Sequence, residues 1–126
     1  MLVFLSYKWE DNSYADGMKG LLNNPNNDYR HLTERERKDL RTQGEEIWKS
    51  YIRDMIVDCD GLICLIGQDT HNATGVIYEL GEAISLRKKI VPVRIQRTSG
   101  GLPKIIRHLT LINWNAREIN DELSKK

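Results

Sequence analysis

One apolar run in the middle of the chain decides the fold: Leu62-Ile63-Cys64-Leu65-Ile66. Three other short runs have a similar character, at residues 2–5, 90–95 and 109–112. Apolar residues that follow one another, rather than alternate with polar ones, indicate strands covered on both faces, as in a parallel sheet. Residues 29–32 could add a short edge strand to these four.

Helical patterns lie between the runs, at about residues 13–22, 47–56, 74–88 and 115–123. The clearest has apolar residues at i, i+1, i+4, i+5, i+8 and i+9, namely Ile47, Trp48, Tyr51, Ile52, Met55 and Ile56. Strands that alternate with helices predict βαβ units with right-handed crossovers. We therefore expect one α/β domain over residues 1–126. It should have three layers, with a mainly parallel sheet between helices.

Two features complicate this prediction. Pro92 lies inside the run at 90–95 and lacks a donor for the strand ladder, which predicts a bulge or a strand that pairs only after it. Residues 23–43 look like a variable loop, since 23–28 hold five polar residues and a proline. Thr33-x-x-Glu36 resembles a helix capping box, and the charged residues after it predict a solvated helical turn, with a lid over a site as the alternative.

Composition and charge exclude several classes of function. The 19 basic and 18 acidic residues leave a net charge of +1, which provides no field to attract nucleic acid or an anionic membrane. The longest apolar run has about five residues, against the roughly 20 that span a bilayer. The first residues lack a basic leader, so we expect a cytoplasmic protein with Cys59 and Cys64 reduced. The three histidines are scattered without ligand spacing, and we expect no metal site.

The candidate site is expected where parallel strands end, because open α/β sheets bind ligands outside the carboxyl ends of their strands. That rule selects three loops, at residues 6–11, 67–72 and 96–101. The chain has neither Gly-x-Gly-x-x-Gly nor a P-loop, which argues against a classical dinucleotide or P-loop site. A receiver domain or a flavin carrier is also disfavoured, because the loop after the first strand has neither an acidic pair nor a Ser/Thr-rich phosphate loop.

The order of four short motifs resembles a known family. Val3-Phe4-Leu5-Ser6-Tyr7, followed by Asp11, resembles the opening of TIR and TIR-like domains. Residues 65–72 are similar to a strand and loop of the bacterial TIR-like family that includes the Thoeris antiphage protein ThsB. Residues 76–80 resemble its Trp-Val-x-x-Glu-Ile element, and residues 89–93 its next strand. The resemblance covers nearly the whole chain except about 23–43.

The resemblance implies a flavodoxin-like sandwich whose sheet has four or five mainly parallel strands, and we expect the strand order 2-1-3-4-5. It also implies an enzyme that uses NAD as its substrate. Such enzymes cleave the bond between nicotinamide and ribose, and some cyclise the remainder into a nucleotide signal for antiphage defence. The family's catalytic glutamate corresponds to Glu79. The dinucleotide would be bound by residues of the first two loops: Ser6, Tyr7, Lys8, Asp11, His71 and Asn72. The implied partners are NAD, an effector protein reached through the signal, and copies of the same chain.

Each of these residues also has a purely structural interpretation. Glu79 could be a carboxylate on a helix surface, Ser6 could satisfy a neighbouring backbone group, and Asp11 could cap the first helix. Tyr7 and Trp9 could be packing residues, and His71 with Asn72 could simply form a turn. The family often has Ser and Trp six and four residues before the glutamate, where this chain has Ala73 and Gly75. That departure favours a second hypothesis, a catalytically silent module that binds nucleotide or acts as a scaffold.

Overall fold

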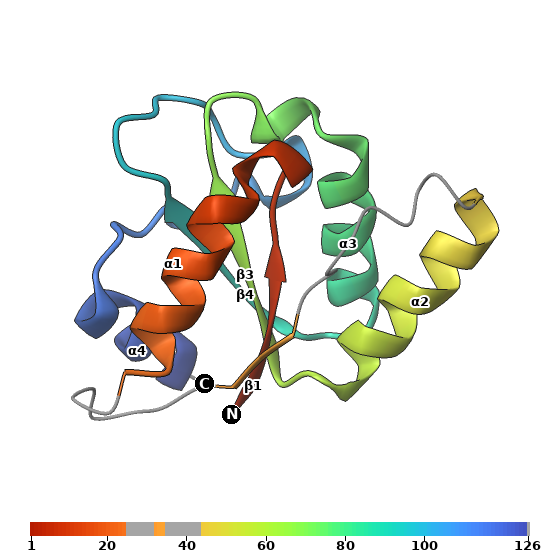
Figure 1. The fold of residues 1–126 in the computed structure, drawn as a ribbon, viewed down its shortest axis with the longest axis horizontal. Coiled ribbons are helices and arrows are strands. Elements are labelled where there is room, and N and C mark those ends of the chain that lie inside the picture. The colour runs from red at the N-terminus through yellow and green to blue at the C-terminus, as the bar shows by residue number, and fades with distance from the viewer. Residues whose placement is uncertain (25–31, 35–43, 126) are drawn as a thin grey trace.

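A computed structural model of the protein describes residues 1–24, 32–34 and 44–125, and a parallel sheet forms its centre (Figure 1). The strands are β1 (Leu2–Ser6), β2 (Leu32–Glu34), β3 (Gly61–Ile66) and β4 (Lys89–Arg94). Every pair of neighbouring strands is parallel, and the order is β2-β1-β3-β4. The α/β class and the sheet order of the first four strands are confirmed.

Helices cover both faces of the sheet and make three layers (Figure 1). On one face lie α1 (Asn12–Leu22) and α4 (Ala116–Ser124), and on the other lie α2 (Glu45–Asp58) and α3 (Thr74–Ser85). Short 3-10 turns, η1 (Trp9–Asp11), η3 (Thr70–Asn72) and η4 (Lys104–Ile106), join these elements. None of the helices in these described ranges combines the length and the apolar character needed to cross a membrane.

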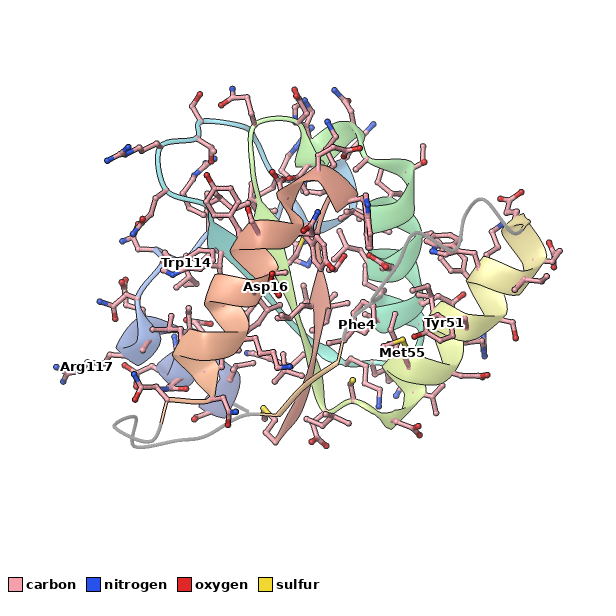
Figure 2. All side chains as sticks on the ribbon, in the orientation of Figure 1. Phe4, Asp16, Tyr51, Met55, Trp114 and Arg117 are labelled. Atoms are coloured by element: carbon pink, nitrogen blue, oxygen red, sulfur yellow. The ribbon has the colours of Figure 1, made fainter. Side chains whose placement is uncertain are left out.

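The core is divided by the sheet into two apolar clusters. Val3 and Leu5 of β1 belong to the cluster under α1 and α4, whereas Phe4 between them belongs to the cluster under α2 and α3. Successive side chains of a strand point to opposite faces. Figure 2 shows Phe4 on the side of α2, with Trp114 across the sheet beside α1. Burial of both faces explains why β1 and β3 are apolar without alternation.

The predicted fifth strand is reduced to one bridge, between Val93 and Ile112. There the Arg94 amide donates to the Ile112 carbonyl, and the Ile112 amide donates to the Pro92 carbonyl, both at 2.9 Å. The backbone N–H and C=O groups of residues 92 and 94 therefore point away from β3. The N–H that Pro92 lacks would lie on that outer side, so its absence does not interrupt the pairing with β3. The predicted bulge or late pairing is wrong, because β4 pairs with β3 from Lys89 to Arg94.

Two helices differ from their predicted faces or ends. In α2, Ile47 and Tyr51 are 58% and 37% exposed, so the stripe that faces the sheet is narrower than predicted and consists of Trp48, Ile52 and Ile56. Helix α3 ends at Ser85, three residues before the predicted end. Arg87 adopts a left-handed φ of 57°, and the Lys88 amide bonds the Ala83 carbonyl, which closes the helix in a Schellman motif.

The charged segment after the first helix is described only in part. Thr33 lies in β2, in register with Val3 of β1, so it does not begin a helix and the capping-box prediction is wrong. The described part of the edge strand is Leu32–Glu34, which overlaps the predicted range 29–32 at Leu32, and residues 29–31 lie outside the described residues. The predicted helical turn and its alternative, a lid, fall mostly on residues 35–43, which lie outside the described residues.

Candidate functional site

A buried pair of polar side chains joins the end of β1 to the middle of α3. Ser6 Oγ donates a hydrogen bond to Glu79 Oε1 at 2.6 Å, the short distance expected between a hydroxyl and a carboxylate. Glu79 is 5% exposed and Ser6 is fully buried. The serine thus contacts the glutamate side chain, a partner that neither structural interpretation of these two residues anticipated.

Glu79 is buried because of its phase on α3. It lies three residues after Val76, one before Leu80 and four before Ala83, all of which are buried. Residues at these spacings share one face of a helix. The sequence signal was therefore present: the apolar face of the third helix includes position 79, and a carboxylate there requires a polar partner.

The Glu79 carboxylate lines a cavity of about 30 Å³, which we call the Glu79 cavity. Its lining comes from β1, η1, α2 and α3: Leu5, Tyr7, Lys8, Trp9, Trp48, Ala73, Gly75, Val76 and Glu79. That volume holds about two water molecules. The cavity therefore has to widen before a sugar can enter.

The loop after β1 provides two of the predicted binding residues, Tyr7 and Lys8, and also Trp9 to the lining of this cavity. Tyr7 and Trp9 line it, with their rings stacked at a centroid distance of 6.5 Å. Lys8 also lines it and lies 3.9 Å from Asp69 Oδ2. The packing interpretation of Tyr7 is correct as well, because Tyr7 is part of the apolar core under α1.

Asp11 lies beside the loop that follows β3 and does not line the Glu79 cavity. An added methyl group at Gly67 would be 2.8 Å from Asp11 Oδ2, so the carboxylate packs directly over that glycine. Burial raises the pKa of Asp11, and the positive charge of Lys8 opposes the shift. Asp11 occupies the N-cap position of α1, as predicted, although its side chain makes no capping hydrogen bond.

His71 and Asn72 are exposed on η3 and are not among the residues that line the Glu79 cavity. Their part in ligand binding stays a prediction.

The loop at 96–101 is occupied by structural bonds to the loop after β3. The Ser99 amide donates to Gln68 Oε1 at 3.0 Å, and Gly100 packs so closely on the backbone of residues 67 and 68 that a side chain there would clash.

Cys64 of β3 lies next to the buried pair, since it is in register with Ser6 of the neighbouring strand β1. Burial raises the pKa of its thiol strongly, and the Glu79 carboxylate raises that pKa further. A thiol in this environment stays protonated and unreactive. Cys59 and Cys64 are both free, as predicted. Among the described residues, no three His, Cys, Asp or Glu side chains gather as metal ligands would.

A second, larger hollow of about 390 Å³ lies between α2 and α3, and we call it the α2–α3 groove. It shares Trp48 and Gly75 with the Glu79 cavity. Its other lining residues are Glu45, Lys49, Thr74, Ile77 and Tyr78. Sequence reasoning assigned Trp48 only to the core, because its place at both hollows depends on how α2 packs on α3.

The sequence signature of the TIR domain family matches residues 3–125. The chain belongs to the TIR domain family. Among the curated proteins, none matches it in sequence. The order and spacing of the motifs around Ser6 and Glu79 therefore belong to a TIR domain, as the resemblance implied.

Solved structures with a similar fold include one described as an N-glycosidase and two described only as domains. The CMP N-glycosidase BcmB of Clostridium botulinum is 18% identical, with a TM-score of 0.59 over 99% of this chain and 100% of its own. The TIR domain of the Toll-related receptor TRR-2 of Hydra magnipapillata is 17% identical, with a TM-score of 0.60 over 94% and 88%. A prokaryotic SEFIR domain is 16% identical, with a TM-score of 0.55 over 96% and 86%. At these identities the likeness shows the fold.

Proposed function

We propose that this TIR domain is a nucleotide N-glycosidase that consumes NAD, with Glu79 as its catalytic carboxylate. One observation carries the proposal. Glu79 is buried at the carboxyl end of the sheet, is held by Ser6 at 2.6 Å, and lines a cavity whose other walls include three aromatic side chains and one lysine. Buried carboxylates are costly, and a protein that keeps one beside a cavity is a candidate for site chemistry.

The chemistry requires little beyond that carboxylate. Nicotinamide is a cationic leaving group, so the bond between its nitrogen and the ribose C1′ breaks with both electrons leaving on the nitrogen. The ribosyl group develops positive charge, which a nearby carboxylate stabilises more strongly in a site that excludes water. Water then adds to C1′ and loses a proton, or an adenine nitrogen adds and gives a cyclic product. The first outcome is hydrolysis and the second makes a signal.

The loop after β1 is proposed to hold the rest of the dinucleotide. Tyr7 and Trp9 line the cavity and offer ring surfaces, and Lys8 offers a charge for a phosphate. Ser6 positions the carboxylate, while Asp11, His71 and Asn72 lie further out. The product would act on an effector protein, with self-assembly as a second kind of contact. The setting proposed for this reaction is antiphage defence in the cytoplasm.

The test is release of nicotinamide from NAD by the purified protein, followed by chromatography over time. CMP serves as a second substrate, because the similar fold of BcmB belongs to a CMP N-glycosidase. Glu79→Gln should lower the rate about 100-fold or more. The matched control is Glu82→Gln, three residues along the same helix, which should retain full activity. Equal rates for wild type and Glu79→Gln would refute the assignment of Glu79.

A second candidate function, nucleotide binding without turnover, is favoured by one observation. Ala73 and Gly75 line the Glu79 cavity where the family often has Ser and Trp, and the cavity is only about 30 Å³. NAD that binds to the purified protein without release of nicotinamide, with the same affinity in Glu79→Gln, would support this module over the enzyme.

A further inference from the structure

Trp48 of α2 occupies a special position between the two hollows. It lines both the Glu79 cavity and the α2–α3 groove, although it is only 5% exposed. Its ring centroid lies 5.1 Å from that of Tyr78, at an interplanar angle of 47°. Tyr78 in turn lies under Lys49 Nζ, which is 5.3 Å from the phenol centroid. The groove next to the carboxylate is thus walled by aromatic rings, with a cation at one edge.

Gly75 is the residue that faces this arrangement from α3. It lies four residues before Glu79 and three before Tyr78, so all three share one side of the helix. Like Trp48, it lines both hollows. Because glycine has no side chain, α3 places nothing at this position between the hollows, and the ring present there comes from α2.

We infer that Trp48 is the stacking wall for the leaving base of the nucleotide, and that the α2–α3 groove is the subsite into which this base fits. The inference rests on the proposed function, since it takes the ribose to react at Glu79. The base is attached to the reacting carbon, so it must lie within one bond of the sugar. A groove that adjoins the carboxylate cavity and is bounded by Trp48 and Tyr78 meets that requirement.

The ligand chemistry is that of a small planar heterocycle. A nucleobase or nicotinamide presents π faces that stack on aromatic side chains, largely regardless of its hydrogen-bonding pattern. The groove of about 390 Å³ has room for such a ring, whereas the Glu79 cavity of about 30 Å³ does not. Trp48 therefore replaces, from a different helix, the aromatic side chain that the family often places at position 75.

The test is equilibrium binding of free nicotinamide and free cytosine, measured by titration calorimetry without any turnover. At least one of them should bind, and Trp48→Leu should weaken it about tenfold or more, while Trp48→Phe should lose much less. Trp114→Leu is the matched control, because Trp114 packs on the opposite face of the sheet. Adding Gly75→Trp to Trp48→Leu should restore binding by returning a ring from α3. Which base binds distinguishes a pyridine substrate from a pyrimidine one.

A second measurement keeps the test valid if Trp48→Leu fails to fold. The chain has three tryptophans, so Trp9→Phe with Trp114→Phe leaves Trp48 as the reporter. Saturable quenching of its fluorescence by the bound base is expected. Unchanged emission, unchanged affinity in a folded Trp48→Leu, or no binding of either base would overturn the subsite. Release of nicotinamide that depends on Glu79 would still stand in that case, so the two proposals fail separately.

Discussion

Two glutamates of α3, three residues apart, occupy very different surroundings. Glu79 is turned toward β1, where it is buried and accepts the hydrogen bond of Ser6. Glu82 is turned toward α2, where its Oε2 lies 3.1 Å from Nη1 of the exposed Arg53. The same residue type on the same helix is a proposed site residue in one case and half of an ion pair with an exposed arginine in the other.

The difference teaches that helix phase, and not residue type, decides what a carboxylate can do. In the pair of Glu82 with Arg53 the arginine side chain is 56% exposed and the glutamate 16%, so water reaches the pair and its contribution to stability is small. A buried carboxylate has lost its water and depends on the donors that the fold provides. The predictions below contrast inward and outward positions, beginning with the largest expected effect.

The largest effect is expected for apolar residues on the two sides of α3. Leu80 is fully buried and Ile84 is 41% exposed. Leu80→Ala should lower the free energy of unfolding by about 2–5 kcal/mol, because it leaves a cavity under the helix. Ile84→Ala should change it by about 0.5 kcal/mol or less. Urea denaturation measures both, and similar losses would show that the inward face of α3 is not the stabilising one.

A smaller effect is expected when each glutamate loses its partner. Ser6→Ala removes the hydroxyl that donates to Glu79 and leaves a buried acceptor, which should cost about 1–3 kcal/mol. Arg53→Ala removes the partner of Glu82 and should cost about 0.2–1 kcal/mol. Denaturation of the two variants in the same buffer compares them. A cost for Arg53→Ala as large as that for Ser6→Ala would contradict the contrast between buried and exposed pairs.

The smallest effect concerns Asp11 and depends on pH. Burial raises its pKa in the folded state, so that state holds the proton more tightly than the unfolded chain does. The free energy of unfolding therefore falls as the pH rises from the pKa of Asp11 in the unfolded chain to its raised pKa in the folded state. Above the raised pKa the loss is complete. At about pH 7, Asp11→Asn should be slightly more stable than wild type, whereas in acid the two proteins should be equally stable.

Thermal unfolding across pH checks this prediction. Asp54→Asn, at an exposed position of α2, is the control and should not shift the profile in the same direction. An Asp11→Asn variant that is less stable than wild type at neutral pH would show that the carboxylate makes a favourable contact that outweighs its burial.

Local patterns predicted the parallel sheet and the helices on both of its faces, because continuous apolar runs can be buried only between two layers of helices. The same patterns failed where a neighbour decides the outcome. Pro92 was expected to disturb β4, but its missing donor is on the outer side. Ile47 and Tyr51 were expected inside, yet α2 meets the sheet through a narrower stripe. In each case the deciding contact is with a residue far away in the sequence.

The candidate site likewise has features that the sequence predicted and features that only the structure revealed. The amino-acid order alone placed Ser6 at the end of a strand and Glu79 on a helix, because periodicity is a local property of the chain. Only the tertiary structure brought these side chains to 2.6 Å across 73 positions of sequence, and only the packing of α2 on α3 placed Trp48 opposite Gly75. Such contacts depend on distances between separate elements, which no local pattern contains.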